Sequence, residues 1–430
     1  MPTGLGAGVA GRGRLEVRSD PVVLDVTDFG AVGDGVANDG PAVLAHTCFE
    51  DFDGFRHIRP RFDPERGAVL FLPAGTYRLG PLEGYDRHHS FPFSHFHLRG
   101  EGVGRTTILL DHVEYPHVRI SIHGDPRFGG GVDTSIRDLT IASTLPRPPD
   151  RTSADMNVHL RDLDGFVAER VEVCDGPRIG FHVNSCTDVT IRDCHVHDMC
   201  TDGVHLVGCR DAVVERCHIA DTGDDAVAVW GGNWWNPHQS ADVLLRANRI
   251  ERAGSNGIAL GGCDRVVVED NDVVGTYLTG IGIRPMAQYG PVRGVTIRGN
   301  RVHDAGFHED GYLWGGGIAS GIAVADDIGT GIAITGVRVV GNELGRCRNN
   351  FLRVRGASDV RLVENRLLGP LVAGPAEHQG SGHGSANVDP GDHQPVCVED
   401  SDGVVVIDHV EGWRRAARRL REVARPTPAG

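Results

Sequence analysis

Three aspartates have the spacing in this sequence that best suits chemistry. Asp224 and Asp225 are neighbours, and Asp202 precedes Asp225 by 23 residues. If 23 residues make one turn of a repeating structure, the three carboxylates converge with backbones stacked about 4.8 Å apart. Like charges held this close raise at least one pKa, so one carboxyl keeps a proton while another acts as a base. Glycoside hydrolysis requires this division of roles. The alternative is that these aspartates are turn residues or calcium ligands.

Aromatic side chains follow the aspartate pair directly. Trp230, Trp234 and Trp235 are three of the five tryptophans in the chain, and they lie on or beside an inserted loop. Aromatic faces at a polar surface suit sugar rings, whose C–H faces pack against them. We therefore predict that they bind substrate, although packing of the loop onto the body explains Trp230 equally well. A second insertion, GFHEDGYLWGGG, could form a wall or lid over the site.

Two histidines, His182 and His205, are also 23 residues apart and alternate with apolar residues. This alternation predicts that both face outward near Asp202, either binding substrate or forming a solvent-facing stack. A zinc site needs at least three ligands, and no third ligand accompanies this pair. The sequence therefore predicts neither a metal nor a cofactor.

The element that positions these residues is a repeat. From about residue 132 a β-branched run returns with uninterrupted steps of 23 residues, and the longer steps carry insertions. Its copies are TSIRDLTI, VAERVEV, VTIRDCHV, AVVERCHI, VLLRANRI, VVVEDNDV, VTIRGNRV, VRVVGNEL and VRLVENRL. The sixth position of the full motif is occupied by Leu139, Val171, Cys194, Cys217, Asn248, Asn271, Asn300, Asn342 and Asn365. We expect these side chains to stack as a ladder that changes from apolar to hydrogen-bonded amides.

A period of 23 residues accommodates three short strands and three turns, which is one coil of a parallel β-helix. A β-propeller, the competing fold, needs four strands and ~40 residues per blade. A second strand of each coil aligns as IGFHV, DGVHL, DAVAV, NGIAL, TGIGI, SGIAV and NFLRV. Its first residues are Ile179, Asp202, Asp225, Asn256, Thr279, Ser320 and Asn350. The sequence thus predicts an all-β, single-domain parallel β-helix in which Asp202 and Asp225 share one turn position.

The ends of the chain differ from the repeat. We expect residues 1–20 to be a flexible N-terminus and residues 21–130 to form a cap and the first coils, followed by the central coils and catalytic cleft in residues 131–369. Residues 370–430 should contain a long loop, a last strand and a basic amphipathic helix around Trp413. That helix could bind a membrane or partner, but capping the open end of the solenoid suits it better.

Composition limits the partners and the chemistry. The net charge is −15 and all 43 basic side chains are arginine, which excludes Schiff-base chemistry on lysine and argues against nucleic-acid and membrane partners. A soluble carbohydrate or other polyoxygenated small molecule remains as substrate, with the oligomeric state undetermined.

Glycine, 60 of 430 residues, suits tight turns, and the ten cysteines suggest buried thiols. Without an apolar leader in this sequence we expect a cytoplasmic protein, or a secreted one if a leader has been removed.

Upstream of the repeat, Asp28, Phe29 and Gly30 begin the string DFGAVGDGVAND. This string resembles the N-terminal signature of the pectate-lyase-like superfamily of right-handed parallel β-helix proteins. The resemblance implies a fold and a cap rather than an activity. We expect Asp34 to be a turn residue and Asp39 to cap a helix.

The catalytic segment carries a closer resemblance. Thr-Asp-Gly followed one coil later by Gly-Asp-Asp is similar to polygalacturonases, and TGDDAVAVW followed by SNGIALGG looks more like α-1,3-glucanases and mycodextranases. The resemblance implies an inverting glycosidase with Asp224 as acid and with Asp202 and Asp225 holding water. Asn256 stands where polygalacturonases have histidine, and Arg284 where they have lysine. These departures argue against a galacturonate substrate, while Arg284 could hold an anion or hydroxyls.

The leading hypothesis is therefore an inverting glycoside hydrolase acting on an α-linked glucan or oligosaccharide. One alternative is a biosynthetic β-helix enzyme, an epimerase, lyase or cyclase, that uses the same carboxylates for proton transfer. Another is a carbohydrate-binding β-helix without turnover.

Overall fold

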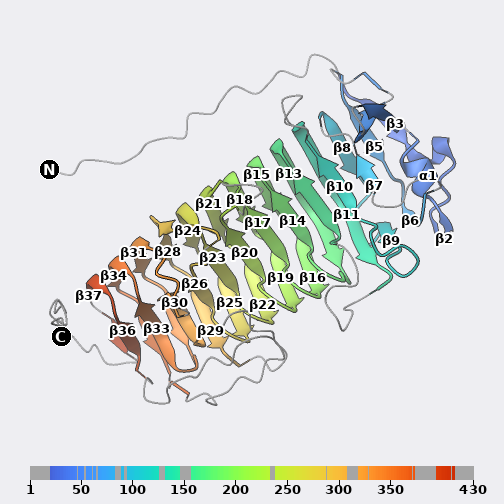
Figure 1. Ribbon diagram of the computed structural model, residues 1–430. Helices are drawn as coiled ribbons and strands as arrows, with labels where there is room; N and C mark the ends of the chain where they lie inside the picture. The colour runs from blue at the N-terminus through green and yellow to red at the C-terminus, as the bar shows by residue number, and fades with distance from the viewer. Residues whose placement is uncertain are drawn as a thin grey trace.

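The computed structural model is an elongated parallel β-helix whose coils stack in chain order from the N-terminal to the C-terminal end (Figure 1). It describes residues 20–411 except for 46, 53–54, 61, 64–65, 83–88, 92–93, 125–130, 146–155, 233–237, 287, 308–317, 328, 370, 373–393 and 408. The predicted fold class is confirmed. No helix in the described part of the chain is long and apolar enough to span a membrane.

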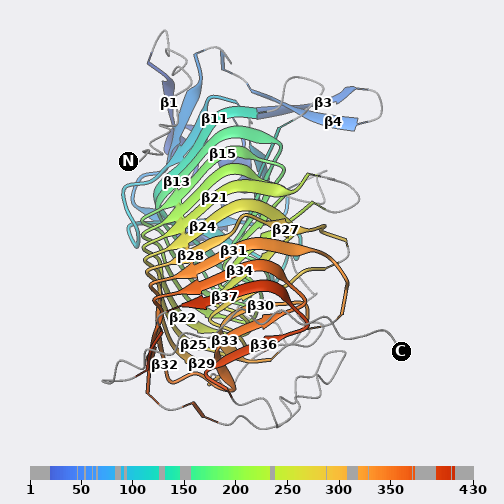
Figure 2. The same cartoon turned by 90° about the vertical axis from the view of Figure 1, so that its left-hand side faces the viewer.

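One coil contains three strands, β15 (Thr187–Arg192), β16 (His195–Met199) and β17 (Val204–Val207). Each strand pairs in parallel with its equivalents in the coils before and after it, which gives three ladders on three faces (Figure 2). They are called here the β15, β16 and β17 ladders. The first two meet in the long strands β11 (Gly131–Ser143) and β13 (Leu163–Cys174), which belong to both.

The other strands of the β15 ladder are β1 (Val22–Asp25), β5 (Ala68–Phe71), β8 (Phe96–Arg99), β18 (Arg210–Glu215), β21 (Ser240–Arg246), β24 (Cys263–Glu269), β27 (Val292–Arg293), β28 (Thr296–Arg298), β31 (Ile334–Val340), β34 (Ser358–Val363) and β37 (Asp402–Ile407). The other strands of the β16 ladder are β2 (Asp34–Asn38), β6 (Gly75–Leu79), β9 (Thr106–Leu110), β19 (His218–Thr222), β22 (Arg249–Ala253), β25 (Asp272–Thr276), β29 (Arg301–Ala305), β32 (Glu343–Gly345), β35 (Arg366–Leu368) and β38 (Val410–Glu411). The other strands of the β17 ladder are β7 (His89–Phe91), β10 (Ile120–His123), β12 (Val158–Arg161), β14 (Phe181–Asn184), β20 (Val227–Trp230), β23 (Ile258–Gly261), β26 (Ile281–Ile283), β30 (Ser320–Ala325), β33 (Asn350–Arg355) and β36 (Val396–Glu399).

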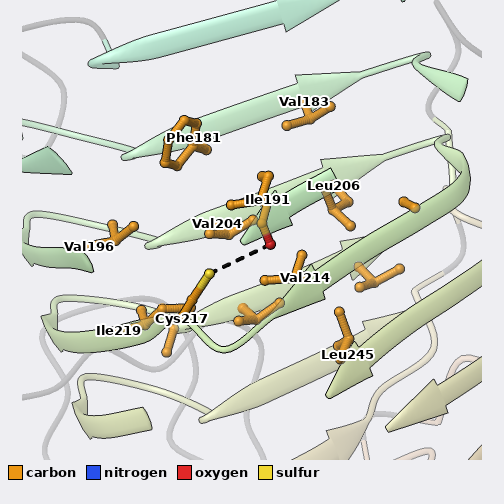
Figure 3. Packing of buried hydrophobic residues seen from close by; sticks show 14 of the residues in the cluster. Phe181, Val183, Ile191, Val196, Val204, Leu206, Val214, Cys217, Ile219 and Leu245 are labelled. Carbon is orange, nitrogen blue, oxygen red and sulfur yellow. Dashed lines mark hydrogen bonds between the residues drawn. The ribbon is translucent and has the colours of Figure 1, made fainter. Parts of the chain in front are cut away.

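The core lies inside the coils, where alternate residues of all three ladders meet. Phe181 from the β17 ladder, Ile191 from the β15 ladder and Val196 from the β16 ladder are fully buried, and Figure 3 shows such side chains packed together. The Cys217 thiol lies among them and donates to the Ile191 carbonyl oxygen at 3.6 Å. All nine cysteines whose side chains are described are buried and free, as buried thiols should be.

The asparagine ladder has the hydrogen bonds that its spacing predicts. In each pair the side-chain nitrogen of one asparagine donates to the Oδ1 atom of the next, at 2.9 Å throughout, and the backbone nitrogen donates to the same atom. The ladder runs through Asn248, Asn271, Asn300, Asn342 and Asn365. The backbone nitrogen of Cys217 donates to Asn248 at 3.0 Å, where the apolar part of the ladder ends.

On the outside, arginine–aspartate pairs join adjacent coils at equivalent turn positions. In four pairs the guanidinium reaches both carboxylate oxygens of an aspartate in the neighbouring coil, and both residues have a positive φ of 50–60°. The pairs are Arg170–Asp138, Arg216–Asp193, Arg252–Asp221 and Arg265–Asp242. A left-handed backbone is unfavourable for arginine, at about 1–2 kcal/mol per residue, so these contacts offset a cost.

The N-terminal cap consists of the 3-10 helix η1 (Val26–Phe29), the short helix α1 (Gly40–Val43) and an antiparallel hairpin of β3 (Thr47–Phe52) and β4 (Phe55–Pro60). Asp34 accepts hydrogen bonds from two following backbone nitrogens, as a turn residue does. Asp39 immediately precedes α1 but makes no capping hydrogen bond; its carboxylate instead closes the turn at Val32 and Gly33. The N-terminal segment 1–19 and the expected C-terminal helix, with Trp413, lie outside the described residues.

Candidate active site

The three aspartates come together on one edge of the β17 ladder. Asp202 and Asp225 each lie two residues before the equivalent first residues of β17 and β20, because Val204 pairs with Val227. One carboxylate oxygen from each of Asp202, Asp224 and Asp225 lies within 4.8 Å of the other two. Asp202 and Asp225 are buried, whereas Asp224 is half-buried. The register of the coils therefore produces the cluster that the 23-residue interval predicted.

Hydrogen bonds fix the cluster in a chain that runs along the helix axis. Asp202 Oδ2 lies 2.6 Å from His205 Nδ1, and Asp202 Oδ1 accepts the backbone N–H of Asp225 at 3.1 Å. Asp225 Oδ1 in turn accepts both the backbone N–H and the side-chain N–H of Asn256, at 2.9 and 2.8 Å. Residues of three successive coils thus hold the carboxylates of Asp202 and Asp225 in place. The groups that bind them lie in or beside the regular strands of the β17 ladder.

Burial and charge act on the ionisation of this cluster. Burial, followed by the negative charge of Asp202, raises the pKa of Asp225 to about 6, although the Asn256 hydrogen bonds and the Arg284 charge oppose the rise. Burial lowers the pKa of Arg284, and Asp225, Asp327 and Asp224 counteract it. A carboxyl that exchanges its proton near pH 6 is suited to acid–base chemistry. Asn256 and Arg284 therefore act electrostatically on the aspartates.

His182 and His205 face outward from the β17 ladder in one column, as predicted, and they pair directly in register. The sequence interpretation missed the next member, His159, whose ring stacks on His182 with centroids 4.9 Å apart. Burial lowers the pKa of His182 to about 3 and lowers that of His159 still further. These two rings are neutral at neutral pH. The signal for His159 was present, since it precedes His182 by 23 residues within an alternating run.

Of the three tryptophans predicted to bind substrate, Trp230 lies in the described part of the chain. Trp230 ends β20 and is 7% exposed, with its ring 5.0 Å from that of Tyr289 and packed with Ala228 and Ala259. A ring covered in this way packs Met286 and Tyr289 onto the solenoid, which is the alternative that the sequence left open. Trp234 and Trp235 lie outside the described residues, and so does the insertion at residues 308–317.

Beyond His205 the outward column contains Ala228, Ala259, Gly282 and Ala323, and then the fully buried Arg353. The Arg353 guanidinium pairs with Asp327 at 3.1 Å and with Glu399 at 3.0 Å. Sequence reasoning did not single out this arginine, although its place in the NFLRV strand matches the histidine column. Small side chains therefore separate the histidines from a buried ion-pair network.

The arrangement can transfer protons and hold hydroxyl groups. The buried Oδ1 atom of Asn256 has no hydrogen-bond partner among the described residues, and it lies 3.2 Å from the position that a Cβ on Gly282 would take. An unpaired acceptor of this kind, which has almost no accessible surface, is satisfied when a small donor such as a buried water reaches it. The three aspartates also have the spacing of cation ligands, which keeps the calcium interpretation open as an alternative.

Comparison with known proteins agrees with this architecture. A family model described as "Right handed beta helix region" matches residues 179–367. A mannuronan C5-epimerase of Azotobacter vinelandii, AlgE1, is 30% identical over 193 residues, which are 43% of this chain but only 12% of that protein. The matched segment thus spans about an eighth of the length of this relative.

Solved structures have the same fold at lower identity. The catalytic domain of a family GH87 α-1,3-glucanase in complex with nigerose superimposes with a TM-score of 0.56 at 12% identity, over 94% of this chain and 67% of the other. An exopolygalacturonase from Thermotoga maritima gives a TM-score of 0.53 at 13% identity, over 93% and 94% of the two chains. The chain thus has the right-handed parallel β-helix fold, as its sequence predicted, and the proteins that it resembles in sequence or in fold include carbohydrate-active enzymes.

Proposed function

We propose that this protein is a carbohydrate-active enzyme and, more specifically, a glycoside hydrolase that uses Asp202, Asp224 and Asp225. The observation that carries the proposal is the convergence of three carboxylates in which Asp225 has its pKa raised to about 6. Carboxyls this close cannot all be ionised at low cost, so the cluster keeps one proton up to about pH 6. A retained proton beside an ionised carboxylate is the equipment that glycosidic cleavage needs.

Exposure and hydrogen bonding suggest the roles within the cluster. Asp224 is half-buried and the most accessible of the three, so it is the group that donates a proton to the leaving oxygen. Asp202 and Asp225 hold the attacking water between them, and the ionised form of Asp225, a stronger base than an ordinary carboxylate because of its raised pKa, takes up the proton. His205 keeps Asp202 in place through the 2.6 Å contact, and Asn256 does the same for Asp225.

The stereochemical outcome is a separate part of the proposal. The resemblance to polygalacturonases and glucanases implies inversion, whereas inverting enzymes usually keep their carboxyls about 6.5–9.5 Å apart. The oxygen separations here, within 4.8 Å, are shorter than that range. We propose inversion on the basis of that resemblance, although short separations, about 5–5.5 Å, are typical of retaining enzymes, and proton NMR of the first sugar anomer released decides between the two.

The substrate that fits best is a neutral or weakly charged polyoxygenated sugar. Among the described residues, Arg284 is the cation that lowers the pKa of Asp225, and the carboxylates nearby offset its charge. In the described part of the chain, a uronate carboxylate would approach three aspartates with this partly compensated charge to receive it. Hydroxyl groups instead can donate to the three carboxylates themselves.

The test is Asp224→Asn, assayed for release of reducing ends from a panel of α-glucans and oligosaccharides. We expect at least a 100-fold loss of kcat, since general acid catalysis contributes about 10²–10⁴-fold. Asp211→Asn is the matched control, because Asp211 is an exposed aspartate of β18 with a positive φ that asparagine tolerates. Full activity of Asp224→Asn on a substrate that the wild type cleaves would overturn the mechanism.

A second candidate is a C5-epimerase, favoured by the 30% identity to mannuronan C5-epimerase AlgE1 over 43% of the chain. Epimerisation removes a proton next to a carboxylate and returns one to the other face, which the Asp202–His205 pair could support on one side. Incubation with mannuronan in deuterated water distinguishes the two functions. Deuterium at C5 of mannuronan without chain cleavage identifies an epimerase, whereas no exchange into mannuronan together with new reducing ends from the α-glucan panel identifies a hydrolase.

A further inference from the structure

A second group of ionisable side chains lies on the outer face of the β16 ladder, away from the aspartates. Glu172 of β13 pairs in register with His195 of β16, and His197 follows two residues along the same strand. Strand residues two apart point to the same face, so both imidazoles stand beside the Glu172 carboxylate. All three side chains are half-buried. The aspartate cluster lies past the next turn, because β16 ends at Met199 and Asp202 follows.

The donor atoms of this group have the spacing of a metal site. Glu172 Oε1 lies 3.4 Å from His197 Nε2 and 3.7 Å from His195 Nδ1, and one donor from each residue lies within 4.8 Å of the others. Around a tetrahedral Zn²⁺ with bonds of about 2.0–2.1 Å, donor atoms lie roughly 3.3–3.4 Å apart. The two separations from Glu172 approach these values, and the two histidine donors lie within 4.8 Å of each other.

Hydrogen bonds orient two of the three donors. The Thr140 hydroxyl donates to Glu172 Oε2 at 2.9 Å, which leaves Oε1 toward the histidines. His197 Nδ1 lies 2.7 Å from Asp198 Oδ2, so Nδ1 carries the proton and the lone pair of Nε2 faces Glu172. A carboxylate behind a histidine in this way is typical of metal ligands.

The third donor, His195, is held by stacking. Its ring is parallel to that of His218, with centroids 4.6 Å apart and planes 3° apart. His218 is itself fixed by its 2.9 Å contact with Glu251.

We propose that Glu172, His195 and His197 form a Zn²⁺ site with a fourth coordination position open to solvent. Two imidazoles and one carboxylate suit a borderline first-row ion, whereas Ca²⁺ and Mg²⁺ prefer all-oxygen sites. Three protein ligands with an open position allow the ion to bind water or an external ligand. The site is independent of the proposed glycosidase chemistry, since it shares no residue with the aspartate cluster.

The competing explanation is a set of ion pairs in which protonated histidines simply contact Glu172. Isothermal titration calorimetry of the full chain, stripped with EDTA and dialysed, separates the two with ZnCl₂ as the probe and CaCl₂ as the comparison. We expect one equivalent of Zn²⁺ to bind and Ca²⁺ in excess not to displace it. His197→Ala should lower the affinity for Zn²⁺ at least 100-fold, and Asp198→Asn about 10–100-fold through loss of the orienting carboxylate.

Two control variants locate the site. His303→Ala removes a histidine of the same ladder that lies 3.8 Å from Glu343, and it should bind Zn²⁺ like the wild type. Asp224→Asn should also bind Zn²⁺ normally, because the aspartate cluster is a separate group. Circular dichroism of each variant checks folding without metal. The proposal is overturned if the wild type binds no Zn²⁺, if His197→Ala binds as well as the wild type, or if Asp224→Asn removes the binding.

Discussion

Asp202 Oδ1 accepts the backbone N–H of Asp225 at 3.1 Å, so the carboxylate of one coil is held by the main chain of the next. The same pattern continues from Asp225 to Asn256. A site built on strand register in this way needs no ordered loop to position its acidic groups. The regular pairing of strands in the β17 ladder therefore fixes the positions of the carboxylates. Loops of different length between coils leave the cluster intact.

The raised pKa of Asp225 has a consequence for stability. Its pKa of about 6 in the folded chain exceeds the value of about 3.9 expected when unfolded, so the folded state is penalised as pH rises through this window. The penalty above pH 6 reaches up to about 3 kcal/mol for a shift of roughly two units. Asp225→Asn should therefore raise the free energy of unfolding at pH 7.5 and raise it much less at pH 4.5, while removing activity. Urea denaturation at both pH values measures this; an equal difference at both would contradict it.

His205 should act by positioning Asp202 rather than by binding substrate. His205→Gln loses the 2.6 Å contact but keeps a polar side chain on the outer face, so we expect kcat to fall about 10-fold or more with KM little changed. His159→Gln is the matched control two coils away in the same column, and its kinetics should be those of the wild type. Steady-state kinetics on the substrate found for the wild type provide the measurement. A rise in KM alone would assign His205 to substrate binding.

The asparagine ladder should contribute strongly to stability. Asn300→Ala leaves the side-chain and backbone nitrogens of Asn271 without their buried acceptor, and each unsatisfied group costs about 1–3 kcal/mol. We expect a loss of roughly 2–5 kcal/mol in the free energy of unfolding, measured by chemical denaturation. Asn184→Ala, at a half-buried position of β14 outside the ladder, should change it by less than about 1 kcal/mol. Similar losses in both variants would refute a special role for the ladder.

Much of the fold and the meeting of the aspartates could be predicted because both follow from one number, the 23-residue coil. An interval of 23 residues places Asp202 beside Asp225, and the stacking of asparagine amides follows from the same interval. The interval does not determine which side chains on the same strand act together, or which side chains contact a loop. The packing of Trp230 under Tyr289 depends on an insertion whose path has no periodicity.

The Glu172–His195–His197 group illustrates the same limit in another way. Glu172 and His195 are one coil apart, and His218 follows after a further 23 residues, so the stack was present in the sequence. His197 joins the group because it lies two residues after His195 on the same strand. Its side chain therefore points to the same face as His195, beside the Glu172 carboxylate of the neighbouring strand. Asp39 departs from its predicted capping role for a comparable reason, since the nearby Val32–Gly33 turn offers its carboxylate two backbone donors.

The absence of lysine gains a structural explanation in the arginine–aspartate pairs between coils. Arg252 reaches both oxygens of Asp221, at 2.7 and 2.6 Å, and only a planar guanidinium has the fork that this geometry needs. Lysine would bring the same charge and the same unfavourable positive φ with a single point of contact.

A combined variant with Arg170, Arg216, Arg252 and Arg265 changed to lysine should melt at a lower temperature than the wild type at low salt, although each pair is half-exposed and contributes little alone. The difference should shrink in 1 M NaCl, because salt screens exposed charges. Differential scanning calorimetry at both salt concentrations is the measurement, with Arg361→Lys, outside these pairs, as the control. An unchanged melting temperature would mean that the choice of arginine does not stabilise the stacking of the coils.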